Sequence, residues 1–286
     1  MESTTTFTLT ATDGHAMHAK VWVPQEPPVG VVILIHGFYE HLGRYEHVAK
    51  FMNDHQMVVY AMDARGHGKT KGIRGHAKFP QVLDDVEQLL MHARAENTEL
   101  PIVIYGHSWG GCIVSNFLLR KPVNELSAAV LSAAWLKLAL TPPKGKALLG
   151  DIMSVIWPSL TVANKMEPGT LSRDPAVEEA YLKDPLVHDK ISAGIFKQTI
   201  AAGEWARQHA NELKVPTFVM HGTDDNLIAF SGSEEFAKNA GAMATFHAWE
   251  GLRHELHNEP DQLQVLETVW DFIEKTLSLK QSEAKA

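Results

Sequence analysis

The sequence predicts an α/β fold with a mostly parallel central sheet, helices on both faces of that sheet and a helical insertion. Apolar runs of strand length alternate with amphipathic helical patterns along most of the chain. Repeated β-α-β units place parallel strands side by side, with their helices covering both faces. The alternation breaks between about residues 133 and 195 and then resumes. We therefore divide the 286 residues into a core over 1–132, a cap over 133–195 and a second core part over 196–286.

The elements follow from local patterns, taken in chain order. Residues 7–11 and 15–23 predict two antiparallel strands that turn at Asp13-Gly14. Residues 30–36 are continuously apolar up to His36, as expected of a central strand that is buried on both faces. Further strands are predicted over 57–62, 102–105, 128–132, 215–221 and 244–249. Helices are predicted near 44–54, 82–90, 112–119 and 231–240, because apolar residues recur there every three or four positions. A final helix is predicted with Pro260 in its first turn and one apolar face made by Leu263, Leu266, Val269, Trp270, Ile273 and Leu277.

Composition and charge exclude several classes of protein. The net charge is −8 and there is no run of Lys or Arg, so nucleic acid is not an expected partner. The single cysteine, Cys112, excludes an internal disulfide and fits a reducing compartment, so we expect a cytoplasmic location. Cys112 belongs to an apolar helical pattern, which favours core packing over thiol chemistry. No signal peptide is expected, and no apolar stretch reaches the roughly 20 residues of a membrane span.

The most informative stretch is Gly106-His107-Ser108-Trp109-Gly110, which lies between a predicted strand and a predicted helix. Strand, sharp turn and helix around a Gly-x-Ser-x-Gly are typical of a nucleophile elbow, where the serine hydroxyl projects above the sheet edge. A β-carbon at either glycine would collide with the neighbouring strand or helix. Ser108 is therefore the candidate nucleophile.

A serine hydroxyl needs a base to take its proton and a third group to orient that base. In this architecture the chain order is serine, acid, histidine, which leaves His247, His254 and His257. His247 falls inside a predicted strand and His257 at the entry to the last helix. His254 follows the end of a strand, in a loop at the catalytic edge, so we predict that His254 is the base and keep His257 as the alternative.

The acid is expected directly after the strand that ends at His221. Gly222-Thr223-Asp224-Asp225 offers two candidates. Asp225 lies deeper in the turn, whereas Asp224 has the position of a surface turn residue. We predict Asp225 as the acid, which would hold the tautomer of His254 and stabilise its imidazolium form.

A tetrahedral intermediate also needs preorganised donors for its oxyanion. The backbone N–H of Trp109, directly after the nucleophile, is one expected donor. The loop that follows the strand over 30–36 offers the N–H of Phe38 as the second.

A metal site is the competing interpretation of another loop cluster. His36, His41, Asp63 and His67 are metal-binding residue types, but no two of them have the spacing of a zinc peptidase motif. Hydrogen bonding within the loops is the favoured interpretation, and no metal or cofactor is expected.

With these residues in hand, the chain resembles the α/β-hydrolases of the monoacylglycerol lipase and lysophospholipase branch over about residues 5–277. The matching pieces are His36-Gly37-x-x-Glu40-His41 with Arg44-Tyr45, Asp63-x-x-Gly66-His67-Gly68, Gly106-His107-Ser108-Trp109-Gly110-Gly111, His221-Gly222-x-x-Asp225 and Gly251-x-x-His254-x-x-x-Asn258-Glu259. The resemblance implies a triad of Ser108, Asp225 and His254, and an oxyanion hole from Phe38 and Trp109. It also implies a cap after the sixth strand, and Glu40 and Arg44 near the polar head of the ester.

Three departures from the family pattern stand out. Trp109 replaces a common methionine, Phe38 replaces a smaller residue, and Lys69-Thr70 replaces a common x-Ser. Bulk at positions 38 and 109 would narrow the acyl side of the pocket.

The implied function is that of a serine ester hydrolase, which cleaves monoacylglycerols or similar single-chain lipid esters through an acyl-enzyme. The alternatives are a lysophospholipase or general carboxylesterase, a serine peptidase of the same fold and a binding protein without catalysis. The apolar segment over 147–162, with Ile156 and Trp157, is expected to contact the acyl chain and to touch a membrane surface transiently. Burial of this segment within the cap is the competing explanation. The oligomeric state is not predicted.

Overall fold

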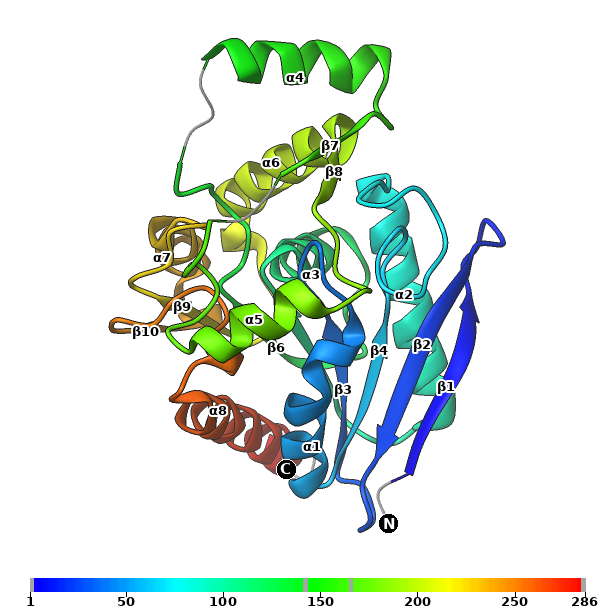
Figure 1. Ribbon diagram of the computed structural model, residues 1–286. Helices are drawn as coiled ribbons and strands as arrows, with labels where there is room; N and C mark the ends of the chain where they lie inside the picture. The colour runs from blue at the N-terminus through cyan, green and yellow to red at the C-terminus, as the bar shows by residue number, and fades with distance from the viewer. Residues whose placement is uncertain (1–2, 141–143, 165–166, 284–286) are drawn as a thin grey trace.

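The computed structural model describes residues 3–140, 144–164 and 167–283 and contains an eight-stranded sheet in the order β1-β2-β4-β3-β5-β6-β9-β10 (Figure 1). Its strands are β1 (Ser3–Thr10), β2 (Ala16–Val23), β3 (Gly30–Ile35), β4 (Met57–Met62), β5 (Ile102–His107), β6 (Leu126–Ser132), β9 (Thr217–Gly222) and β10 (Ala244–Trp249). β2 is antiparallel to both β1 and β4, and every other neighbouring pair is parallel. The predicted fold class is confirmed.

Helices cover both faces of the sheet because the side chains of its central strands alternate between two cores. In β3, Val31, Ile33 and Ile35 belong to one buried cluster, whereas Val32 and Leu34 belong to the other. The first cluster includes side chains of α2 (Phe79–Glu96), α3 (Trp109–Arg120) and α7 (Phe230–Ala240). The second includes those of α1 (Glu46–Asp54) and α8 (Gln262–Glu283). Burial on both faces explains why this strand is continuously apolar.

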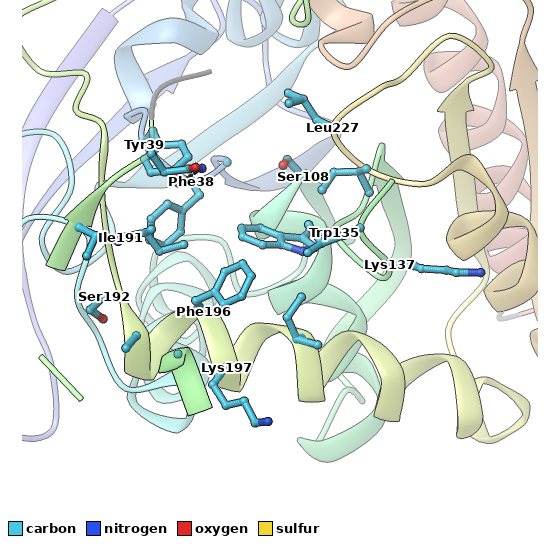
Figure 2. Close-up of a pocket in the computed structure, with 18 of the residues that line it drawn as sticks. Phe38, Tyr39, Ser108, Trp135, Lys137, Ile191, Ser192, Phe196, Lys197 and Leu227 are labelled. Carbon is cyan, nitrogen blue, oxygen red and sulfur yellow. Dashed lines mark hydrogen bonds between the residues drawn. The ribbon is translucent and has the colours of Figure 1, made fainter. Parts of the chain in front are cut away.

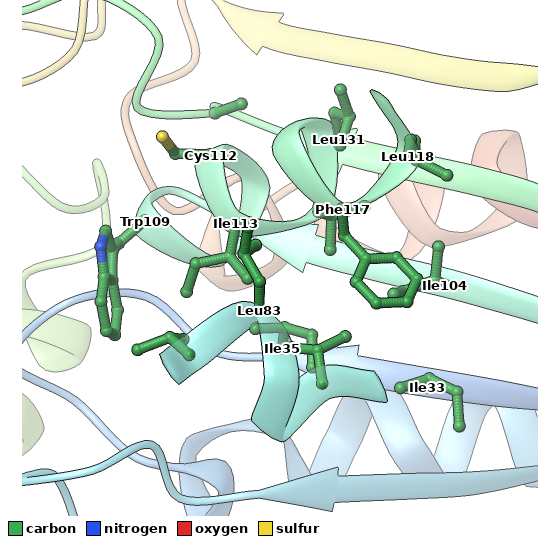
Figure 3. Packing of buried hydrophobic residues seen from close by; sticks show 14 of the residues in the cluster. Ile33, Ile35, Leu83, Ile104, Trp109, Cys112, Ile113, Phe117, Leu118 and Leu131 are labelled. Atoms are coloured by element: carbon green, nitrogen blue, oxygen red, sulfur yellow. The ribbon is translucent and has the colours of Figure 1, made fainter. Parts of the chain in front are cut away.

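Helix α3 packs against the sheet through the first of these two clusters. Figure 3 shows Phe117 pointing from α3 towards Ile104 of the sheet, and Ile113 pointing towards Ile35 and Leu83. Cys112 is fully buried on the same helix, and burial raises the pKa of its thiol. A buried, protonated thiol fits the predicted packing role of Cys112.

The insertion lies between β6 and β9 and forms the upper part of the molecule in Figure 1. It contains α4 (Lys144–Ile156), β7 (Thr161–Ala163), α5 (Pro175–Lys183), β8 (Lys190–Ser192) and α6 (Ala193–Gln208). β7 and β8 form a separate antiparallel pair. α6 packs against α4 of the insertion and also against α3 and α7 of the core, so the boundary at residue 195 stays a prediction.

Two details at the helix ends differ from the sequence-based expectation. A 3-10 turn over Leu42–Tyr45 precedes α1, and further 3-10 turns occupy Ala210–Glu212, Gly241–Met243 and Leu256–Asn258. α8 begins at Gln262, so Pro260 precedes the helix instead of lying in its first turn. Among the described residues, no helix is long and apolar enough to cross a membrane.

Candidate active site

Ser108 occupies the sharp turn between β5 and α3 in a conformation that L-residues rarely adopt. Its φ is 53° and its ψ is −115°. The turn closes only because its neighbours are glycines: a β-carbon on Gly110 would overlap the carbonyl oxygen of Ile35, and one on Gly106 would overlap that of Gly110. The backbone strain is the expected signature of a nucleophile elbow.

The structure brings the three predicted triad residues into one hydrogen-bonded series. His254 Nε2 lies 2.9 Å from Ser108 Oγ, and His254 Nδ1 lies 2.6 Å from Asp225 Oδ2. All three side chains are buried, although they come from three separate loops at the carboxyl edge of the sheet. This geometry allows the Ser108 proton to pass to His254 while Asp225 fixes the imidazole.

Asp225 is held as a carboxylate by four donors. Oδ2 accepts hydrogen bonds from His254 Nδ1 and His221 Nε2, and Oδ1 accepts them from the backbone N–H groups of Leu227 and Ile228. Burial alone would raise the pKa of Asp225, but His254 and His221 hold it far below its ordinary range. Asp224, the rejected candidate, is exposed.

His254 has the electrostatic environment of a base. Burial disfavours its protonated form, but the charge of Asp225 and the hydrogen bond to it outweigh burial and raise the pKa of His254. The alternative base, His257, is fully buried, and neither of its ring nitrogens has a partner among the described residues. Burial lowers the pKa of His257 well below its ordinary value. His247 lies within β10.

Two backbone N–H groups beside Ser108 are available for an oxyanion. Within the described part of the chain, neither the N–H of Phe38 nor that of Trp109 donates a hydrogen bond to the protein. The ring centroids of these two residues lie 4.8 Å apart in an edge-to-face arrangement. The Trp109 indole also donates to Thr199 on α6 at 3.1 Å, so its bulk is directed into the core rather than into the pocket.

A cavity of about 870 Å³ opens above Ser108, between the core and the insertion. Figure 2 shows Phe38, Trp135 and Phe196 around the cavity near Ser108. Other apolar side chains that line it include Leu138, Leu149, Met153, Leu160, Ile191, Ile200, Leu227 and Ile228. Glu40, Tyr181 and Glu255 form a polar part of its wall, and the further polar side chains that line it include Lys137, Asp151, Asn164, Lys197, Glu204 and Arg207. The cavity is therefore lined mainly by apolar side chains, with polar groups at a few places.

Glu40 and Arg44 belong to a buried ion network at this polar wall. Glu40 Oε1 accepts from the Gly37 N–H and from Tyr45, each at 2.6 Å, and Oε2 accepts from Arg44 at 2.6 Å. Arg44 also binds Glu255 through two hydrogen bonds of 2.6 and 2.8 Å. Although burial opposes ionisation, Arg44 lowers the pKa of Glu255 to about 2.

Glu40 and Arg44 therefore have different positions relative to the cavity. Glu40 lines the cavity and fixes Gly37, directly before Phe38, whereas Arg44 is not among the lining residues. Arg44 lies behind the wall and holds both carboxylates in place. A direct contact of Arg44 with a substrate head group stays a prediction.

Ile156 and Trp157 do not face the cavity, which corrects the expectation that they contact the acyl chain. Their exposed fractions are 74% and 57%, and neither lines the cavity. Leu149 and Met153, one helical turn apart on α4, line it instead. Ile156 is the last residue of α4, and the exposed Leu148, Ile152 and Val155 lie on a different side of the helix from Leu149 and Met153, so the segment has both an inner and an outer apolar surface.

The loop cluster proposed as an alternative metal site is engaged in hydrogen bonds. His36 Nε2 accepts from the Ala64 N–H at 2.9 Å, and both carboxylate oxygens of Asp63 accept from loop N–H groups. His41 Nε2 lies 2.8 Å from Asp184 of the insertion. His67 stacks on Trp109. Among the described residues, no group of three or more His, Cys, Asp and Glu side chains is arranged to hold a metal ion.

Sequence reasoning did not assign roles to several residues of the site. His221 contacts Asp225, Glu255 contacts Arg44, and Tyr181 places its ring 4.8 Å from the Arg44 guanidinium. His221 begins the His221-Gly222-x-x-Asp225 motif, so its spacing to the acid was a usable signal. Glu255 had only its position next to His254, and Tyr181 of α5 had none.

The elbow serine, the histidine on its hydroxyl and the buried carboxylate define a serine hydrolase of the α/β-hydrolase class. The chain belongs to the Hydrolase_4 family, described as serine aminopeptidase, S33, whose profile matches residues 26–261.

Individual relatives place the chain within the monoacylglycerol lipase branch. A monoacylglycerol lipase of Mycolicibacterium smegmatis is 37% identical over 256 residues, which cover 88% of this chain and 91% of that protein. An abhydrolase domain-containing protein of Dictyostelium discoideum is 30% identical over 96% of this chain, and the chain spans only 30% of its length. The crystal structure of a Paleococcus ferrophilus monoacylglycerol lipase has a TM-score of 0.82 at 27% identity, covering 92% of this chain and 98% of that one.

Proposed function

We propose that this protein hydrolyses monoacylglycerols to fatty acid and glycerol through an acyl-enzyme on Ser108. The observation that carries the proposal is the cavity above Ser108, which joins an apolar surface from the insertion to a small polar wall at Glu40 and Glu255. A single-chain ester has the same division into an apolar chain and a small polar head. The names of the lipase relatives agree with this choice.

The proposed reaction has two halves. His254 Nε2 takes the Ser108 proton as Oγ attacks the ester carbonyl, and the oxyanion is stabilised by the N–H groups of Phe38 and Trp109. His254 then gives that proton to the leaving glycerol oxygen as the acyl-enzyme forms. In the second half a water attacks the acyl-enzyme, His254 takes its proton, and the fatty acid leaves as Ser108 Oγ is protonated again. Asp225 stabilises the imidazolium in both halves.

Chain length and head group should both affect turnover. Each CH₂ buried against the apolar lining contributes about 0.8 kcal/mol, so long acyl chains should be preferred over acetyl. The polar wall is small, so a glycerol carrying one acyl chain should fit better than one carrying three.

Lysophospholipid hydrolysis and general carboxylesterase activity are the nearest alternatives, because both use the same acyl-enzyme. A peptidase is disfavoured by the chemistry of the polar wall. An aminopeptidase needs a carboxylate near the triad that is free to bind the substrate ammonium, but Glu40 and Glu255 both bind Arg44. The other two carboxylates that line the cavity, Asp151 on α4 and Glu204 on α6, belong to the insertion and are exposed. An ammonium would have to compete with a buried guanidinium already in place.

A panel of substrates tests the proposed function directly. A fluorophosphonate probe should label Ser108 in the native protein, which would exclude a binding protein without catalysis. Monoacylglycerols of medium and long chain should then be turned over faster than triacylglycerols, lysophospholipids and aminoacyl amides. Labelling of Ser108 together with a preference for amides or lysophospholipids would overturn the substrate assignment but not the mechanism.

The outer face of α4 is proposed to touch lipid surfaces transiently. Leu148, Ile152 and Val155 are exposed on this face, and Ile156 and Trp157 are exposed at the end of the helix next to it. Such a face binds a bilayer surface reversibly through its apolar area. The buried lone cysteine fits a reducing compartment, so we expect a cytoplasmic protein with peripheral membrane contact.

Substitution of the outer face tests this contact. Ile156→Ser with Trp157→Ser should weaken binding to phosphatidylcholine vesicles and turnover of vesicle-borne substrate, while a short p-nitrophenyl ester is hydrolysed normally. Leu182→Ser on α5 is a matched control, because Leu182 is 79% exposed away from α4. Equal vesicle binding by the double variant and the control would contradict the proposed membrane contact.

A further inference from the structure

A second histidine contacts the acid of the proposed triad. His221 Nε2 lies 3.0 Å from Asp225 Oδ2, the same oxygen that binds His254 at 2.6 Å. His221 is the penultimate residue of β9 and is fully buried. The catalytic scheme above gives His221 no role, so its position needs a separate explanation.

The hydrogen bonds of His221 determine which ring nitrogen carries its proton. Nε2 faces Asp225 Oδ2 and, at 3.2 Å, the carbonyl oxygen of Ile228. Both oxygens only accept hydrogen bonds, so Nε2 carries the proton and donates it. In the neutral ring, Nδ1 is then an acceptor, and it lies 2.8 Å from Ser233 Oγ.

Ser233 is placed to fix this tautomer. It is fully buried on α7, where its hydroxyl can donate to His221 Nδ1. The series therefore runs from Ser108 through His254, Asp225 and His221 to Ser233, and it is buried throughout. Each donor in this series has an acceptor opposite it.

We infer that His221, with its tautomer fixed by Ser233, is a positioning residue that holds the Asp225 carboxylate in the orientation required by His254. This inference rests on the proposed function, because it concerns the same triad. The two backbone donors at Oδ1 fix one oxygen of the carboxylate, and His221 fixes the other, which is the oxygen that faces His254. His221 itself touches neither Ser108 nor the space where an ester would lie.

The inference has a measurable consequence beyond stability. His221 draws part of the negative charge of Asp225 away from His254, because a carboxylate oxygen shared by two donors binds each less strongly. Loss of the His221 donor should therefore raise the pKa of His254 further and move the acidic limb of the activity profile to higher pH. The other titratable groups that act on His254 include Glu255 and Glu40, which raise its pKa, and the neighbouring His107 and His257, whose charged forms repel that of His254. These groups are unchanged in all the variants below.

Three variants and one control test the role of His221. His221→Leu removes the donor, His221→Gln keeps an N–H near the position of Nε2, and Ser233→Ala removes the group that fixes the tautomer. Ser115→Ala is the control, because Ser115 is also a fully buried serine, on α3, whose hydroxyl bonds a backbone carbonyl. For each purified full-length protein, kcat/KM for a short p-nitrophenyl ester is measured from pH 5 to 9, with thermal unfolding as a check of folding.

The expected results form a ranked series. His221→Leu should lower kcat about 10- to 100-fold, the range expected for one hydrogen bond to a charged group, and shift the acidic limb upwards by about half a pH unit or more. Ser233→Ala should shift the limb in the same direction by less, and His221→Gln should restore most of both effects. Ser115→Ala should match the wild type in kcat and in the position of the limb.

The outcomes separate this inference from the proposed function. A wild-type protein that a fluorophosphonate does not label at Ser108 would overturn the proposed function itself. Normal labelling of the wild type, with acidic limbs unchanged in both His221→Leu and Ser233→Ala, would overturn only the inference. If His221→Leu does not fold, Ser233→Ala decides instead, because it keeps the His221 donor: an acidic limb unchanged in that variant would overturn the inference.

Discussion

Replacing Asp225 by asparagine changes one oxygen to an NH₂ group at a site where all four hydrogen-bond partners are donors. Two backbone N–H groups face Oδ1, and the ring N–H groups of His254 and His221 face Oδ2. With the amide oxygen towards the backbone, the NH₂ opposes both histidines. With the amide flipped, the NH₂ opposes both backbone groups. Neither orientation satisfies the site.

The magnitude of the effect follows from this conflict. His254 can relieve it by moving its proton to Nε2, but an Nε2–H cannot accept the proton of Ser108. Loss of the correct tautomer costs roughly 10⁴ in kcat, which corresponds to about 5.4 kcal/mol of activation free energy. His221 would still face the NH₂, so a buried donor left unsatisfied should lower the free energy of unfolding by about 1–3 kcal/mol.

Steady-state hydrolysis of a p-nitrophenyl ester gives kcat, and urea unfolding gives the stability change. Asp224→Asn is the matched control, because Asp224 is the exposed neighbour, and its carboxylate has Thr223, at 3.5 Å, as its one hydrogen-bond partner among the residues that the structure describes. This control should change kcat less than about twofold. An Asp225→Asn protein that keeps a tenth or more of wild-type kcat, or a larger loss in Asp224→Asn, would refute the assignment of the acid.

Three further predictions concern the nucleophile and two histidines. Ser108→Ala should lower kcat by on the order of 10⁶ and abolish fluorophosphonate labelling, and near-normal activity in a folded variant would contradict it. His254 must be neutral to act as a base, and Asp225 raises its pKa. Activity should therefore fall on the acid side with an apparent pKa above the ordinary histidine value of about 6.5. A profile that is flat down to pH 5 would exclude His254 as the base. Burial keeps His257 neutral in the folded state, so below about pH 6.5 the unfolded chain binds a proton that the folded state excludes. The free energy of unfolding therefore decreases as the pH is lowered below that value. His257→Phe should therefore reduce the slope of unfolding free energy against pH by about 1.4 kcal/mol per unit between pH 6 and 5, and unchanged slopes would contradict the buried, neutral state.

The sequence predicted the fold, and the structure places the three predicted triad residues within hydrogen-bond distance of one another, because both results depend on local patterns. Continuous apolar runs identify strands that are buried on both faces, and glycines around Ser108 identify a turn that no larger residue could form. The carboxyl ends of parallel strands meet at one edge of a sheet, so residues that follow three different strands converge. Position after a strand was enough to prefer His254 to His257, whereas Asp225 was preferred to Asp224 because it lies deeper in the turn after the same strand.

The orientation of the cap helix α4 could not be predicted from the sequence in the same way. The apolar segment over 147–162 was expected to contact the acyl chain, but a short helix with apolar residues on several sides does not specify which side faces inwards. Packing of α4 against α6 decides this, since Leu149 and Met153 in the middle of the helix line the cavity, whereas Ile156 and Trp157 at its end do not and are exposed. For the same reason, the predicted apolar face of α8 was partly wrong: Leu263 is 59% exposed.

By itself, the sequence determined the order of strands and helices, the strained turn at Ser108 and the identity of the three groups that meet there, because backbone sterics and hydrophobic periodicity act over a few neighbouring residues. The tertiary structure alone decided which polar groups pair across long separations. Arg44 meets Glu255 from 211 residues away, and Ser233 reaches the far side of the ring that binds Asp225. Such pairs depend on how whole elements pack, since a buried charge or ring nitrogen takes whichever partner the packing places beside it.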